Sequence, residues 1–150
     1  MKVRSPEEMA AFASKMASEQ SPKAGSARVL SLSGDLGAGK TTFAQAFAKA
    51  LGVEEDVTSP TFVIEKIYPL QGQRFARFIH IDAYRLEDPH ELEVLGFLEE
   101  LKDPANLILI EWPEKAAGLI PEGAIAIRFD IHGDERTIST NGKEESGAGN

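Results

Sequence analysis

The chain of 150 residues contains no cysteine, which excludes disulfides, thiolate zinc sites, iron–sulfur clusters and a cysteine nucleophile. It also lacks an apolar run of the roughly 20 residues that a membrane-spanning helix needs. The first residues, Met1 to Glu8, turn acidic at once and lack the apolar core of a signal peptide. We therefore expect a cytoplasmic protein with no membrane partner.

Positive charge is scarce as well, because 16 lysine and arginine residues stand against 24 aspartate and glutamate residues, for a net charge of -8. Proteins that hold nucleic acid unaided are usually basic, since neutralising phosphates supplies most of the affinity. We therefore expect no DNA partner and no stable, unaided contact with RNA. Binding of a single nucleotide is compatible with this charge, because it needs only a local positive site.

Hydrophobic periodicity and turn residues divide the chain into alternating helices and strands. We expect helices over residues 5–20 and 41–51 and from Asp88 onward. We expect strands over residues 29–32, 62–68, 75–81, 107–110, 124–131 and 136–140. The strands on either side of Gly72 would form a hairpin, which makes the sheet mixed rather than wholly parallel.

Each expected helix carries a boundary signal. Ser5, Pro6 and Glu8 suit an N-cap, a first helical position and a capping acid, Gly52 suits the end of the second helix, and Asp88 suits the start of the third. The apolar positions at helical spacing are Met9, Phe12, Ala13, Met16 and Ala17, then Phe43, Ala46, Phe47 and Ala50, then Leu92, Leu95, Leu98 and Leu101.

This order of elements predicts an α/β fold in which helices flank a mixed central sheet. The length favours one domain, which we place at residues 1–140. Residues 141–150 are polar and rich in glycine, which predicts a disordered tail.

Gly34 to Thr41 matches the phosphate-loop pattern G-x-x-x-x-G-K-[ST] between an expected strand and an expected helix. Glycines let backbone N–H groups turn toward phosphate oxygens, Lys40 would reach the β- and γ-phosphates, and the Thr41 hydroxyl would bind Mg²⁺. The pattern predicts a P-loop NTPase-like fold. The residues expected to contact the nucleotide are Asp35, Leu36, Gly37, Ala38, Gly39, Lys40, Thr41 and Thr42, with Arg136 added from its expected place beside the sheet.

Two acids follow expected strands, Asp82 after residues 78–81 and Glu111 after residues 107–110. The carboxyl ends of strands are where open α/β sheets bind ligands, and a magnesium triphosphate site needs a carboxylate there. Either acid suits that role. His80, on the same side of its strand as Asp82, is more often structural than catalytic, while Arg85 and Trp112 suit structural and functional roles equally.

Two further segments could belong to a nucleotide switch. Val57 to Phe62 clusters hydroxyl groups, and a threonine in such a loop can sense a γ-phosphate through magnesium, although Ser-Pro also favours an ordinary turn. Asp130 to Gly133 matches the D-x-x-G of GTPases, but it lies near the chain end and no N-K-x-D guanine motif is present. We therefore expect ATP rather than GTP.

The motifs taken together resemble the bacterial TsaE (YjeE) family, the small ATPase of tRNA threonylcarbamoyladenosine biosynthesis. The resemblance rests on four segments in order: Gly34 to Thr42, Ser59-Pro60-Thr61-Phe62, His80-Ile81-Asp82-Ala83-Tyr84-Arg85-Leu86 and Glu111-Trp112-Pro113-Glu114. The first segment is shared by many NTPases, whereas the last two are far more specific.

The resemblance implies ATP hydrolysis in support of threonylcarbamoyl transfer to adenosine 37 of tRNAs that read ANN codons. It implies TsaD-like and TsaB-like partners, with tRNA reached only through that complex. It also implies functional roles for Asp82, Glu111 and Trp112, with Glu111 as a magnesium ligand beside Thr41. On this reading Lys40, Asp82 and Glu111 are the catalytic residues, and turnover without partners is slow.

Two alternatives remain open at this point. A small-molecule kinase would need a second substrate pocket and usually an arginine-rich lid, and no long basic insertion is present. A nucleotide-gated binding module would bind ATP without hydrolysing it. The acidic stretch from Asp88 to Glu100 could contact a partner, although a solvated helix face is the simpler interpretation.

Overall fold

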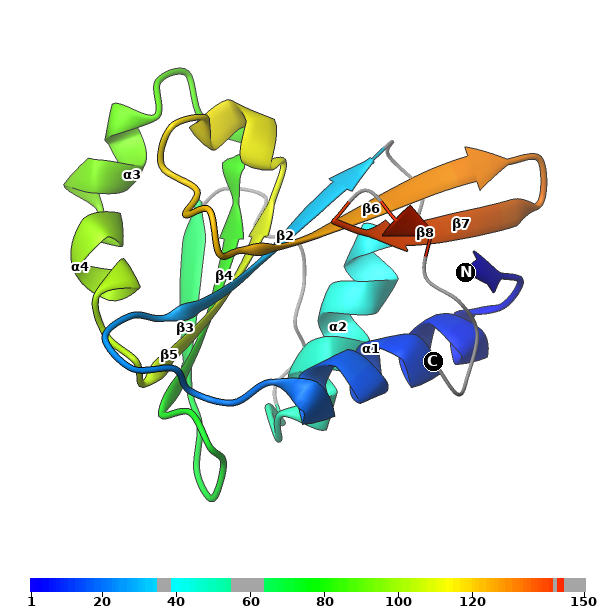
Figure 1. Ribbon diagram of the computed structural model, residues 1–150, viewed down its shortest axis with the longest axis horizontal. Helices are drawn as coiled ribbons and strands as arrows, with labels where there is room; N and C mark the ends of the chain where they lie inside the picture. Colours follow the sequence, from blue (N-terminus) through cyan, green and yellow to red (C-terminus); the bar gives the residue numbers. More distant parts are fainter. Residues whose placement is uncertain (35–38, 55–63, 142, 145–150) are drawn as a thin grey trace.

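The computed structural model describes residues 1–34, 39–54, 64–141 and 143–144. These residues form a mixed eight-stranded sheet with helices on both faces (Figure 1). In chain order the elements are β1 (Lys2–Val3), α1 (Pro6–Glu19), β2 (Arg28–Gly34), α2 (Lys40–Ala50), β3 (Glu65–Pro69), β4 (Arg77–Asp82), η1 (Ala83–Arg85), α3 (His90–Val94), α4 (Phe97–Leu101), β5 (Asn106–Glu111), η2 (Pro113–Ala116), β6 (Ile125–His132), β7 (Glu135–Thr140) and β8 (Lys143–Glu144).

The centre of the sheet is parallel and its borders are antiparallel. Strands β6, β2, β5 and β4 lie side by side in that order and run parallel. Strand β3 borders them as a hairpin partner of β4, and β7 and β1 border them on the other side. The predicted mixed α/β sheet is therefore confirmed, and the carboxyl ends of the four central strands share one edge.

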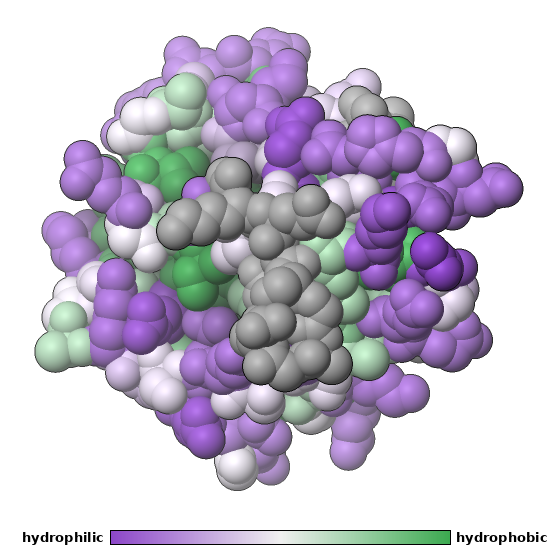
Figure 2. Space-filling view, turned by 45° about the vertical axis from the view of Figure 1, so that its right-hand side comes forward, coloured by the Kyte–Doolittle hydropathy of each residue, from purple (hydrophilic) through white to green (hydrophobic). Residues whose placement is uncertain are grey.

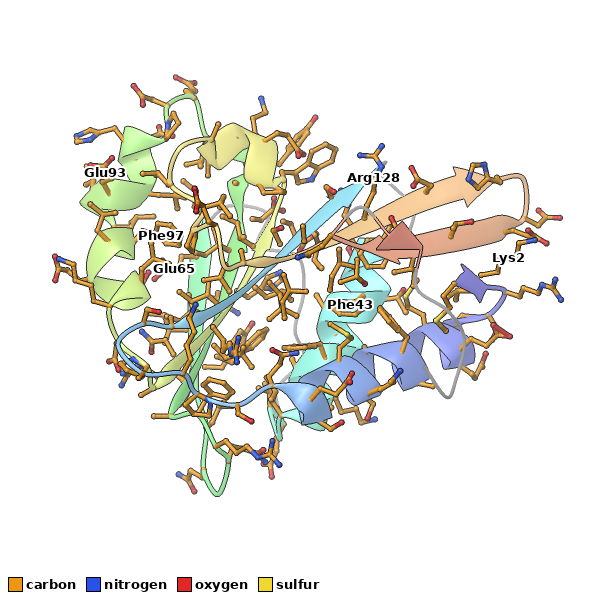
Figure 3. The ribbon with its side chains drawn as sticks, viewed as in Figure 1. Lys2, Phe43, Glu65, Glu93, Phe97 and Arg128 are labelled. Carbon is orange, nitrogen blue, oxygen red and sulfur yellow. The ribbon has the colours of Figure 1, made fainter. Side chains whose placement is uncertain are left out.

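A separate hydrophobic core covers each face of the sheet. Leu107 and Leu109 of β5 face α1 and α2, while Ile108 and Ile110 face η1, α3, α4 and η2. All residues of β5 are buried, as the continuous apolar run predicted. Figure 3 shows Phe43 of α2 between that helix and the sheet, where its ring lies 5.6 Å from that of Phe129.

Helix α1 forms as its sequence predicts. The Ser5 side chain accepts a hydrogen bond from the Glu8 backbone N–H at 3.1 Å, and Glu8 accepts one from the Arg4 N–H. Pro6 occupies the first helical position, where its missing N–H has no helical partner to lose. All the apolar positions expected to be buried are buried, so the helix is held by its cap and by one apolar stripe.

Helix α2 ends where expected but buries a slightly different face. Gly52 has a φ of 88° and follows the helix as its C′ residue. Phe43 and Phe47 are buried as predicted, but Ala44 and Ala48 are buried with them in place of Ala46 and Ala50. Alanines occur on both sides of the two phenylalanines in this helix. The sequence pattern therefore did not show which side packs against α1.

The single helix predicted from Asp88 is instead two short ones. Gly96, with a φ of 95°, separates α3 from α4. The four leucines are spaced three residues apart. On a helix of 3.6 residues per turn, each leucine therefore lies about 60° around the helix from the one before it. One straight helix could not bury all four against the same surface. The break at Gly96 buries Leu92 and Phe97 and leaves Leu95 and Leu98 exposed.

Several smaller features were not visible in the sequence pattern. Strand β1 pairs with β7, and β8, within the segment expected to be a disordered tail, also pairs with β7. Residues 142 and 145–150 lie outside the described residues. The GTPase-like Asp130 to Gly133 segment ends β6 and enters the turn to β7, where Gly133 has a φ of 64°.

Hydrophilic side chains make up most of the outline of the face toward the β6–β7 hairpin (Figure 2). Of the helices that the structure describes, none is long and apolar enough to cross a membrane.

Candidate functional site

Three strand ends meet at one edge of the sheet. In the register of the sheet, Glu111 of β5 lies opposite Leu32 of β2 on one side and Asp82 of β4 on the other. The backbone N–H of Trp112 donates to the Leu32 carbonyl at 3.1 Å, so the pairing of β5 with β2 continues one residue beyond Glu111. The two acids that the sequence singled out are therefore neighbours, and both lie beside the strand that leads into the phosphate-loop motif.

Lys40 joins that motif to the end of β5. It is the first residue of α2 and only 5% exposed. Its ammonium Nζ donates to the Gly34 carbonyl at 2.7 Å and lies 3.6 Å from the centre of the Trp112 ring. A buried ammonium at a helix N-terminus is a strong attractor for an anion, because the helix dipole adds to its charge.

The two described glycines of the loop are required by its geometry. Gly34 has a φ of 130°, and a Cβ there would lie 2.0 Å from the Phe129 carbonyl oxygen. Gly39 has a φ of 108°, and a Cβ there would lie 2.5 Å from the end of the Met9 side chain. The first close approach is to backbone and cannot be relieved by a side-chain rotation.

Glu111 is held by His80 across the parallel pair β4 and β5. The His80 Nε2 and Glu111 Oε2 atoms lie 2.7 Å apart, and both side chains are almost completely buried. The His80 ring stacks on Phe78, with ring centres 6.2 Å apart. His80 was expected to be more often structural than catalytic. The structure places it in contact with Glu111, the candidate magnesium ligand, where it restricts the position of that carboxylate.

Asp82 is positioned by the turn that follows it. Its Oδ1 accepts a hydrogen bond from the Tyr84 N–H at 3.0 Å and so caps η1. The Tyr84 ring lies 5.1 Å from that of Trp112, and Trp112 itself has a left-handed backbone with a φ of 59°. Tyr84 was not singled out from the sequence as a candidate site residue, although it belongs to the His80–Leu86 segment that carries the family resemblance. Arg85 is exposed.

A pocket of about 300 Å³ lies beside the start of α2. Residues from both ends of the chain meet there, because β1 pairs with β7 and brings the start of α1 next to Arg136. The lining residues are Val3, Arg4, Ser5, Pro6, Met9, Gly39, Thr42 and Arg136. Three of the positions expected to bind the nucleotide, Gly39, Thr42 and Arg136, therefore share one hollow.

Other expected site residues lie outside the described residues. These are Asp35, Leu36, Gly37 and Ala38 of the phosphate loop and the Ser59–Thr61 segment. Thr41 is exposed on the first turn of α2.

Two oxygen donors that the sequence singled out suit a hard cation. Thr41 supplies a hydroxyl and Glu111 a carboxylate, and Mg²⁺ prefers such oxygen ligands, keeping several waters and sharing substrate phosphates. In the described part of the chain no group of three or more His, Cys, Asp or Glu could hold a metal ion.

The parallel sheet centre, with the phosphate-loop motif between the end of β2 and the start of α2, defines a P-loop NTPase-like α/β protein. The crystal structure of YdiB from Bacillus subtilis has the same fold. It matches with a TM-score of 0.71 and 32% sequence identity, and the match covers 93% of this chain and 82% of that chain.

The family is narrower than the fold. Residues 3–138 match the family model of threonylcarbamoyl adenosine biosynthesis protein TsaE, and the chain belongs to that family. Among relatives named tRNA threonylcarbamoyladenosine biosynthesis protein TsaE, that of Haemophilus influenzae is 39% identical over 71% of this chain and 65% of its own length. That of Bacillus subtilis is 42% identical over 74% of this chain and 67% of its own length.

Proposed function

We propose that this chain is a magnesium-dependent ATPase that supports threonylcarbamoylation of adenosine 37 in tRNAs reading ANN codons. It acts as a nucleotide switch on a complex of TsaD-like and TsaB-like proteins. The family assignment supports the pathway. The observation that carries the nucleotide chemistry is the buried Lys40 ammonium, lodged between the Gly34 carbonyl and the Trp112 ring beside Glu111.

In this proposal the chain's own residues bind and orient the triphosphate. Lys40 exchanges its contact with Gly34 for the β- and γ-phosphates, and the backbone at the start of α2 receives phosphate oxygens. Water attacks the γ-phosphorus, the bond to the ADP oxygen breaks, and ADP and inorganic phosphate leave. Asp82 orients that water, and such a reaction needs positioning and charge stabilisation more than covalent chemistry.

Thr41 and Glu111 would hold Mg²⁺, which neutralises phosphate charge when bound. His80 keeps the Glu111 carboxylate in one orientation through the 2.7 Å contact. The pocket beside Arg136 and Ser5 is the proposed place for the adenosine, because it opens next to Gly39 and Thr42 at the loop. The base would then lie between the start of α1 and Arg136 of β7.

The net charge of -8 supports a role that reaches tRNA through partners. A cytoplasmic location follows from that role. Slow turnover alone is part of the proposal, since many P-loop NTPases take an essential group from a partner protein.

The test is phosphate release from Mg-ATP by the chain alone and with its TsaD-like and TsaB-like partners. We expect slow release alone, faster release with the partners, and loss of both with Lys40→Ala. Phosphate that appears only with a small-molecule acceptor, as a phosphorylated product, would identify a kinase instead. Partner function that needs Lys40 while no phosphate is ever released would identify a non-hydrolysing binding module.

A further inference from the structure

We propose that the outer surface of residues 87–103, the α3–α4 surface, docks a protein partner that presents apolar side chains within a rim of lysine and arginine. The inference rests on the proposed function and names the part of the chain that receives the partner. Only η1 and Leu86 separate Asp82 from the start of this surface, so a docked protein would lie next to the candidate active site.

The α3–α4 surface exposes large apolar side chains. Val94, Leu95 and Leu98 are 74%, 48% and 41% exposed, and Ile67 on the neighbouring edge strand β3 is 50% exposed. In the described part of the chain, the one other large hydrophobic residue that is exposed is Tyr84, which lies just before this segment. A concentration of exposed apolar side chains on one segment of a soluble protein commonly marks an interaction site.

Two of these residues, Val94 and Leu95, line a shallow hollow of about 440 Å³. It is lined by Ile64, Asp88, His90, Glu91, Val94 and Leu95. The lining combines the apolar side chains of Ile64, Val94 and Leu95 with the acids Asp88 and Glu91, and interfaces likewise combine an apolar core with polar groups.

The fold does not need these side chains for its own core. Leu92 of α3 and Phe97 of α4 are completely buried and attach the two helices to the sheet. The left-handed Gly96 between them turns Val94, Leu95 and Leu98 outward. In Figure 3, Phe97 points from α4 toward the sheet and Glu93 lies on the outer side of α3.

The charge of the segment determines which occupant fits. Residues 87–103 contain the acids Glu87, Asp88, Glu91, Glu93, Glu99, Glu100 and Asp103 against the single cation Lys102. That charge repels nucleic acid and anionic membrane, and it repels a second copy of the same face. A protein surface rich in lysine and arginine is attracted, which raises the rate of encounter.

Not every acid of the segment belongs to the rim. Glu91 accepts a hydrogen bond from the Glu87 N–H, and the Glu100 carboxyl pairs with that of Glu65 on β3. The ion pairs of Glu93 and Glu99 among the described residues are local instead, with His90 at 3.6 Å and with Lys102 at 3.8 Å. These two acids can therefore be changed without disturbing the fold.

The experiment measures binding of the TsaD-like and TsaB-like complex to immobilised wild type and three double variants. Glu93→Lys with Glu99→Lys should weaken binding about 10-fold or more, and the loss should shrink as salt rises. Val94→Ser with Leu98→Ser should weaken it by a similar factor of about 10, independently of salt. Hydrogen exchange in residues 87–103 should slow when the partners are added to wild type.

The matched control is Glu19→Lys with Asp134→Lys, which changes the net charge by the same amount on α1 and on the β6–β7 turn. Binding by this control should stay within about twofold of wild type, because distant exposed charges contribute little. ATP binding and thermal stability, measured on every variant, separate a docking defect from misfolding.

Wild-type affinity in both α3–α4 variants would overturn the docking surface while leaving the ATPase proposal intact. Absence of binding by wild type would overturn the proposed partners and this surface together. A wild-type dimer that Val94→Ser with Leu98→Ser dissociates would assign the surface to a second copy and overturn the inference.

Discussion

His80 and Glu111 join β4 to β5 through their side chains, with Nε2 and Oε2 2.7 Å apart in the buried layer beneath the strand ends. The contact restricts the direction in which the Glu111 carboxylate can present its other oxygen. In the proposed function Glu111 binds magnesium, and residues that hold a metal ligand commonly affect metal affinity and activity nearly as much as the ligand itself.

Replacing His80 tests that relationship. His80→Phe keeps an aromatic ring against Phe78 but removes the donor, and it should lower magnesium-dependent phosphate release about 10- to 100-fold. His80→Gln restores a donor and should recover part of the loss. Magnesium titrations of activity are the measurement, and ATP binding without magnesium should stay unchanged. Equal losses in both variants would point to packing alone, and His132→Gln, on the exposed end of β6, is the control.

Trp112 provides an optical reporter, because it is the single tryptophan of the chain and the Lys40 ammonium lies over its ring. Saturating Mg-ATP should change its fluorescence as Lys40 turns toward phosphate. Lys40→Ala should change the resting emission, weaken ATP binding about 10- to 100-fold and remove the nucleotide response. An unchanged spectrum while radiolabelled ATP is bound would show that Lys40 stays on the ring.

Arg136 tests the assignment of the pocket to adenosine. Arg136→Ala should weaken ATP binding about 5- to 10-fold, the worth of one modest polar contact. Tripolyphosphate, which has no base, should bind the variant and wild type equally. Arg128→Ala is the control, since the exposed Arg128 side chain contacts Asp130 of its own strand β6. Equal weakening of both ligands would place Arg136 at the phosphates instead.

Gly34 should tolerate no side chain. Gly34→Ala combines a φ of 130° with a Cβ 2.0 Å from the Phe129 carbonyl oxygen. We expect it to lower the free energy of unfolding by about 3 kcal/mol or more. Gly118→Ala has a φ of 88° but meets nothing within 4 Å, so it should cost only about 1 kcal/mol. Denaturant unfolding of both variants measures the difference, and equal costs would contradict the backbone clash.

A pair of carboxyl groups between β3 and α4 predicts a dependence of stability on pH. Burial and the neighbouring Glu65 raise the pKa of Glu100 from 4.5 to about 8, and burial also raises the pKa of Glu65. Arg77 partly offsets the rise at Glu100, although it is also paired with Asp103. Glu65 Oε2 and Glu100 Oε1 have no donor among the described residues, and a shared proton would satisfy both.

The folded chain thus holds a proton that the unfolded chain releases above about pH 4.5. The free energy of unfolding should fall as pH rises from about 4.5 to about 8, and this contribution should be constant above that window. Glu100→Gln should flatten the slope and raise the melting temperature at pH 8 by about 2–4 °C, a small effect because solvent screens the pair. Calorimetry across pH, with exposed Glu99→Gln as control, measures this. Parallel slopes in wild type and Glu100→Gln would refute the shared proton.

Local signals predicted most of the elements correctly. The Ser5 cap, the C′ Gly52 and the apolar run of β5 each depend on neighbouring residues alone. The prediction of one helix from Asp88 onward was wrong, because a glycine such as Gly96 is compatible both with a continuous helix and with a break between two helices. The packing of Phe97 against the sheet decided between them. Strand β1 is too short to produce a pattern at all.

The sequence by itself determined the phosphate-loop motif, the two strand-end acids and the family, because these depend on residue type and spacing along the chain. Only the tertiary structure placed His80 against Glu111, Lys40 over Trp112 and Arg136 beside the N-terminus of α1. Those contacts join residues far apart in the chain. The order and register of the strands create them, and no local pattern encodes either property.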